Sequence, residues 1–60
     1  MTLEQATAEA TVTAMRGGIR MVVTFNPYAE EPDEAEKYSY HPHAAKHIFK
    51  YEKVVCTIEF

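Results

Sequence analysis

Apolar and polar residues alternate along two stretches near the start of the chain. In residues 6–14 the even positions are alanine or valine and the odd positions are threonine or glutamate; a second apolar alternation follows Gly17-Gly18 in residues 19–25. A period of two places one set of side chains on one face of a strand. A Gly-Gly pair suits the positive φ angles of a tight hairpin turn. The pattern predicts a β-hairpin with strands at residues 6–14 and 19–25.

The register of this hairpin brings both apolar sets to the same face. A two-residue loop places Ala14 opposite Met21 and Ala10 opposite Phe25. A slip of one residue would destroy this match. We therefore expect this face to form the core, and the functional surface to lie elsewhere in the chain.

The same stretch also fits a helix. Thr2 and Gln5 have the spacing of a capping box, and alanines four residues apart, beginning at Ala6, would share one helical face. The β-branched threonines and valine favour a strand. We adopt the strand interpretation and keep the helix as the alternative.

The second half of the chain predicts one helix and a third strand. Pro42 suits the first position of a helix, and in residues 43–52 apolar and basic side chains fall on opposite sides of a helical wheel. Apolar residues alternate again from Val54 to Phe60. We predict a single α+β domain over residues 1–60, with element order ββαβ. Its three-stranded, mostly antiparallel sheet carries one helix on one face. The C-terminal strand lies beside the first strand, in order 2-1-3.

An acidic, tyrosine-bearing connector occupies residues 26–41. Pro32 and the carboxylates after it resemble the first turn of a helix. Residues 37–41 fit either an extension of that turn or a short strand with Tyr38 and Tyr40 on one side, and the sequence leaves both open.

Length and cysteine content limit the class of protein to which the chain can belong. Sixty residues make one small domain, and such a chain buries only about 60% of its unfolded surface. The single cysteine, Cys56, allows no internal disulfide, which is typical of a reducing compartment. The chain has neither the apolar run of a membrane span nor the features of a signal peptide. We expect a cytoplasmic protein, with no membrane partner, that gains stability from a partner or from a homodimer through a sheet edge.

Catalytic and metal-binding patterns are sparse. Cys56 lies among apolar residues of the predicted C-terminal strand, where a thiol is usually a small core side chain. There is no phosphate loop and no nucleophile elbow. We expect no enzymatic activity and no cofactor. His43 and His47 would lie one helical turn apart and are weak candidates for a metal site.

Charge is unevenly distributed along the chain. The net charge is −3, but residues 1–36 hold seven carboxylates against two arginines, and residues 37–60 hold four lysines against two glutamates. The basic side of the predicted helix suggests a nucleic-acid-binding face, which consists of His43, Lys46, His47, Lys50 and Lys53. The overall acidity of the chain argues against this alternative.

The acidic connector is the strongest candidate for a binding surface. Tyrosines supply contact area, and carboxylates supply electrostatic complementarity to a basic protein. The candidate residues are Tyr28, Glu30, Glu31, Asp33, Glu34, Glu36, Tyr38 and Tyr40. Such a surface can also mimic the charge of nucleic acid. In size, acidity and lack of catalytic residues the chain resembles the small inhibitors that phages and mobile elements carry against host enzymes. We therefore predict a non-enzymatic protein-binding module, of which an inhibitor is one form.

Overall fold

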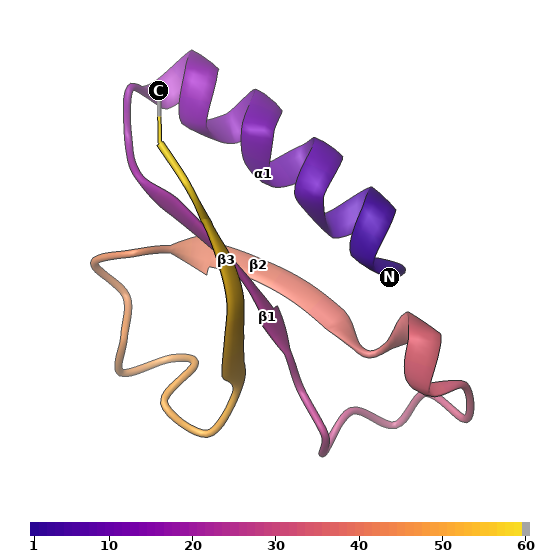
Figure 1. Cartoon of the computed structure of the whole chain (residues 1–60). Helices are drawn as coiled ribbons and strands as arrows, with labels where there is room; N and C mark the ends of the chain where they lie inside the picture. Colours follow the sequence, from indigo (N-terminus) through magenta and orange to yellow (C-terminus); the bar gives the residue numbers. More distant parts are fainter. Residues whose placement is uncertain (60) are drawn as a thin grey trace.

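A three-stranded antiparallel sheet carries one helix on one face (Figure 1). We describe residues 1–59 from a computed structural model. The elements are α1 (Leu3–Gly17), β1 (Met21–Phe25), the short 3-10 helix η1 (Glu34–Glu36), β2 (Tyr38–Pro42) and β3 (Lys53–Ile58). The predicted α+β architecture is confirmed, but the predicted element order is wrong. The helix comes first and the three strands follow it. The final residue of the predicted C-terminal strand, Phe60, lies outside the described residues.

The predicted N-terminal strand is instead helix α1, so the prediction of a hairpin at residues 6–25 is wrong. The capping box is complete, because Gln5 N–H donates to Thr2 Oγ1 at 3.1 Å and Thr2 N–H donates to Gln5 Oε1 at 2.9 Å. The hydroxyls of Thr11 and Thr13 donate to the carbonyls four residues earlier. These bonds satisfy the hydroxyls of two threonines within the helix, although their β-branched side chains favour a strand.

Gly17-Gly18 ends this helix rather than turning a hairpin. Gly18 has φ 62° and ψ 34°, the left-handed conformation that commonly follows the last helical turn. Its N–H donates to the carbonyl of Ala14, and Ile19 N–H reaches the same oxygen at 3.3 Å. The chain then reverses and enters β1.

Strand β1 lies at the centre of the sheet, in the order β2-β1-β3. It pairs antiparallel with both neighbours, and the ladder to β3 has a bulge after Val23. The core between α1 and the sheet contains Ala6, Ala10, Ala14, Met21 and Val23, all buried. The small alanines let α1 lie close to β1. The prediction that the apolar set forms the core holds only in part, because Ala8, Val12 and Ile19 are exposed.

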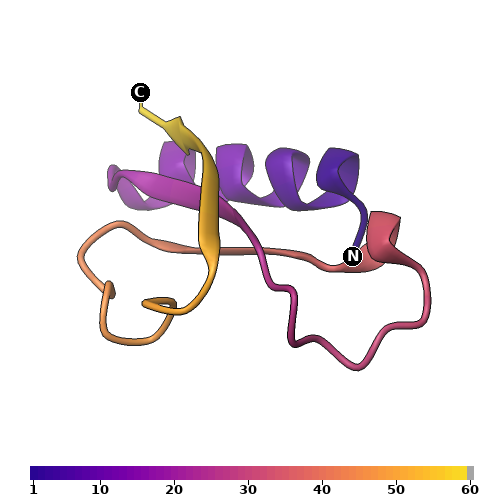
Figure 2. The same cartoon turned by 60° about the horizontal axis from the view of Figure 1, so that its bottom comes forward.

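The predicted helix at residues 43–52 is also wrong. This segment is a series of turns, with hydrogen bonds spanning three residues, such as Ile48 N–H to Ala45 O at 2.9 Å. It packs against the sheet face opposite α1, and both long connections extend on that side (Figure 2). Phe49 is buried there and stacks on His41, with 5.1 Å between ring centroids. Phe49 and Glu52 of this segment both contact groups of the sheet.

The structure decides between the turn and the strand that the sequence leaves open for the end of the acidic connector. Asp33 caps η1 by accepting the N–H of Ala35 at 2.9 Å. Residues 38–42 form strand β2, with Tyr38 and Tyr40 packed against the core.

Among residues 1–59, no helix has the length and apolar character needed to cross a membrane.

Candidate functional site

The residues between β1 and β2 (26–37), here called the acidic loop, hold all five predicted carboxylates on an exposed segment. Each of these side chains is exposed: Glu30, Glu31, Asp33, Glu34 and Glu36. Tyr28 on the same loop is 78% exposed. In contrast, Tyr38 and Tyr40 are half-buried under α1. The structure therefore groups the carboxylates with Tyr28, whereas the other two tyrosines pack against the core.

Local hydrogen bonds shape the acidic loop without burying it. Tyr28 N–H donates to Asn26 Oδ1 at 3.0 Å, which forms a turn closed by the asparagine side chain. Asn26 N–H in turn donates to the carbonyl of Lys37 at 2.9 Å and ties the two ends of the loop together. Within residues 1–59 Arg20 forms an ion pair with Glu59, and His41 Nε2 lies 3.1 Å from Glu52 Oε1, so no described cation pairs with the five loop carboxylates.

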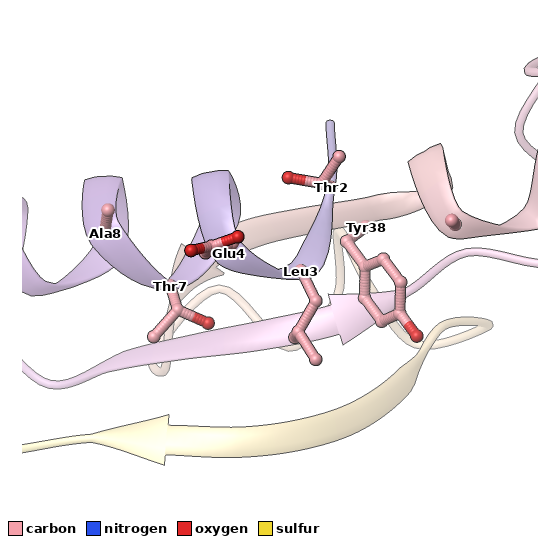
Figure 3. A pocket seen from close by; sticks show the side chains of 7 residues that line it. Thr2, Leu3, Glu4, Thr7, Ala8 and Tyr38 are labelled. Atoms are coloured by element: carbon pink, nitrogen blue, oxygen red, sulfur yellow. The ribbon is translucent and has the colours of Figure 1, made fainter.

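An apolar hollow adjoins the acidic loop beside the first turns of α1 (Figure 3). It occupies about 730 Å³, and its lining includes Leu3, Thr7, Ala35 and Tyr38. Leu3 is 39% exposed although its neighbours on the same helical face are buried. The phenol ring of Tyr38 packs edge-on against Phe25, with centroids 5.3 Å apart. The floor of the hollow is therefore largely apolar.

A second hollow continues from the first toward the edge of the sheet. The two share Ala35 and Tyr38, and the second adds Glu34, Phe25 and residues 53–55 to its lining. Carboxylates thus border an apolar strip, since Glu4 lines the first hollow and Glu34 the second. An apolar centre with a charged rim is the usual arrangement of a protein-binding surface.

The basic residues do not form the helical face that was predicted. Lys46, His47, Lys50 and Lys53 are exposed and His43 is half-buried, but residues 43–52 form turns and do not align these side chains on a helix. The one-turn spacing of His43 and His47 therefore no longer supports a metal site. Among the residues that the structure describes, no group of three or more histidine, cysteine or acidic side chains is placed to hold a metal ion.

A buried polar cluster on the opposite face of the sheet escaped the sequence analysis. Glu52 Oε1 accepts the hydroxyl of Thr24 at 2.6 Å and lies 3.1 Å from His41 Nε2. The carboxylate stands between the hydroxyl and the imidazole, whereas a nucleophilic triad needs the imidazole in the middle. The cluster therefore fastens residues 43–52 to the sheet. The sequence held one sign that this second sheet face is covered. Val22 and Val23 are adjacent apolar residues in a strand, which indicates burial on both faces.

Searches with the whole chain found no matching protein-family model, no similar curated protein and no similar solved structure. The functional argument therefore depends on the geometry of the surface.

Proposed function

We propose that the protein is a non-enzymatic protein-binding module that docks on a basic protein surface through the acidic loop and the adjoining hollow. The observation that carries the proposal is the junction of five exposed carboxylates, free of ion pairs to residues 1–59, with an apolar hollow lined by Leu3 and Tyr38. Carboxylates steer a basic partner into contact, and the apolar floor supplies area that is buried on binding.

The expected partner presents lysine or arginine around an apolar or aliphatic group. Such surfaces are common where proteins bind nucleic acid, so the acidic loop can compete with nucleic acid for its partner. An inhibitor of a nucleic-acid-binding protein is the form of this function that the charge favours.

Affinity capture with matched variants tests the docking surface. The substitutions Glu30→Lys, Glu31→Lys and Glu34→Lys reverse three carboxylates and retain Asp33, whose carboxylate caps η1. We expect the triple variant to lose the basic protein that the wild type retains. Heparin, a polyanion, should displace that protein from the wild type. Glu9→Lys on α1, outside the acidic loop, serves as the control and should still capture it. Retention of the same protein by the triple variant would refute the assignment.

The hollow is tested by filling it. Ala35 lines both hollows and is exposed, so Ala35→Trp should obstruct the contact and weaken binding of the captured partner by about tenfold or more. Ala44→Trp makes the same change at an exposed alanine of the other long connection and should leave binding unaltered. Circular dichroism establishes that each variant retains its fold. Equal binding by both variants would exclude the hollow from the interface.

A further inference from the structure

Glu4 of α1 borders the first hollow but is not part of the acidic loop. Its side chain is exposed, and among residues 1–59 it is the one charged residue in the lining of that hollow. Figure 3 shows Glu4 with Leu3 and Thr7 on one side of the hollow and Tyr38 on the other. Within the same described residues Glu4 makes no ion pair. Its carboxylate is therefore available to a partner that enters the hollow.

The acidic loop supplies carboxylates on the other side of the first hollow. Ala35 lies between Glu34 and Glu36 in η1 and lines both hollows, and Glu34 itself lines the second. Both glutamates are exposed. Carboxylates from two separate elements, α1 and η1, thus border one apolar floor.

We propose that the first hollow receives one large apolar side chain of the basic partner, and that basic residues on either side of it bind Glu4 and Glu34. The segment of the partner that docks here therefore has the order basic–apolar–basic. This inference rests on the proposed function. It adds Glu4, a recognition residue outside the acidic loop, and it specifies the order of residues in the partner.

The charges along the two hollows locate this segment. Lys53 lines the second hollow together with Val54 and Val55, so the end of that hollow near β3 disfavours a basic side chain. The first hollow has no such cation in its lining. An exposed ion pair contributes little affinity by itself, whereas burial of the apolar side chain contributes most of it. The two carboxylates therefore select which apolar segments bind.

Titration with synthetic peptides, followed by NMR, tests the order of residues. The probe is Gly-Arg-Ala-Leu-Ala-Arg-Gly with blocked ends, and its matched control, Gly-Leu-Ala-Arg-Arg-Ala-Gly, has the same composition and charge. We expect the probe to bind about threefold more tightly than the control and to shift the amide signals of Leu3, Ala35 and Tyr38. Equal affinities, or no shift at these residues, would overturn the proposal. Equal binding of Gly-Glu-Ala-Leu-Ala-Glu-Gly would show that apolar surface alone selects the occupant and would also overturn it.

A matched pair of variants tests the role of Glu4. Glu4→Gln and Glu9→Gln remove the same charge from exposed positions of α1, and Glu9 lines neither of these two hollows. We expect Glu4→Gln to weaken binding of the probe by about threefold and Glu9→Gln to change it by less than about 1.5-fold. Glu4 also lies in the first turn of α1, where a carboxylate favours the helix, so urea unfolding establishes that both variants are folded. Equal binding by the two folded variants would overturn the assignment of Glu4.

Affinity capture separates failure of this inference from failure of the proposed function. Suppose that the triple lysine variant of the acidic loop loses the captured protein while the probe and its control bind the wild type equally. The proposed function is then supported and the inference fails. Retention of the captured protein by the triple variant would refute the proposed function, and with it the inference.

Discussion

At the scale of single residues, Thr24 shows how the sheet is stabilised on both faces. Its side chain is fully buried, and its hydroxyl donates to Glu52 across 28 residues of sequence. The same carboxylate oxygen lies 3.1 Å from His41, which stacks on Phe49. One acceptor therefore joins a core strand, an edge strand and the turns that cover them. Buried polar groups of this kind are costly to leave without a partner.

We predict that Thr24→Val destabilises the fold by about 1 kcal/mol, because valine keeps the shape of threonine but removes the hydroxyl that donates to Glu52. Urea unfolding monitored by circular dichroism measures the change. Thr57→Val is the matched control on a neighbouring strand, since Thr57 is exposed, and it should change stability by less than about 0.5 kcal/mol. Equal effects of the two substitutions would show that the Thr24–Glu52 bond adds nothing.

At the scale of elements, the sequence predicts β1 and β3 well, leaves β2 open and predicts α1 wrongly. The strand predicted at residues 19–25 contains β1, and the one predicted from Val54 onward covers most of β3. At residues 6–14 the same signal was misleading, because alanines at 6, 10 and 14 share a face with either a period of two or a helical repeat. In the structure the capping box at Thr2 begins the helix and the left-handed Gly18 ends it. Residues 43–52 have a helical pattern, but tertiary contacts of Phe49 and Glu52 outweigh it.

The candidate site, too, is predictable from the sequence only in part. Exposure of the acidic loop followed from its composition, since carboxylates beside proline rarely form a core. The hollow could not be predicted, because it lies between the start of α1 and the residues Ala35 and Tyr38. The sequence predicts a strand where the structure has α1. The inward position of Tyr38 and Tyr40 follows from the pairing of β2 with β1, which the sequence also left undecided.

We predict opposite effects of alanine at the two glycines. Gly18→Ala places a Cβ in a left-handed conformation and should cost about 1 kcal/mol. Gly17→Ala meets only ordinary contacts with Ile19, at 3.5 Å or more, and should be neutral or stabilise the helix by about 0.5–1 kcal/mol. Thermal unfolding of both variants provides the measurement. A hairpin turn would need positive φ at both positions, so equal losses would contradict the helix end described for α1.

We also predict that Phe49 is the main contact holding residues 43–52 on the sheet. Phe49→Ala removes a side chain that is 5% exposed and should cost about 3 kcal/mol, whereas Tyr51→Ala removes one that is 74% exposed and should cost less than about 0.5 kcal/mol. Phe49→Leu provides a milder variant if the alanine substitution unfolds the domain. Comparable losses from Phe49 and Tyr51 would mean that these turns do not cover the second face.

At the scale of the whole molecule, most of the chain belongs to the two packed faces of the sheet, and the proposed binding surface lies outside them. The helix covers one sheet face, and Phe49 with its neighbours covers part of the other. The acidic loop remains outside both cores and is held by its ends and by the cap of η1. Apart from Asp33, which caps η1, the carboxylates of the loop are exposed and make no ion pair within residues 1–59. Reversing them should change binding much more than stability.

The proposed docking of this loop on a basic protein is tested most directly by titration calorimetry of the captured partner against two matched single variants. Glu31→Lys in the acidic loop and Glu9→Lys on α1 change the net charge equally, and both side chains are exposed. We predict that Glu31→Lys raises the dissociation constant by about tenfold, more at low salt than at high salt, while Glu9→Lys changes it by less than about twofold. Equal effects of the two variants would show that only net charge matters and would contradict a docking surface at the acidic loop.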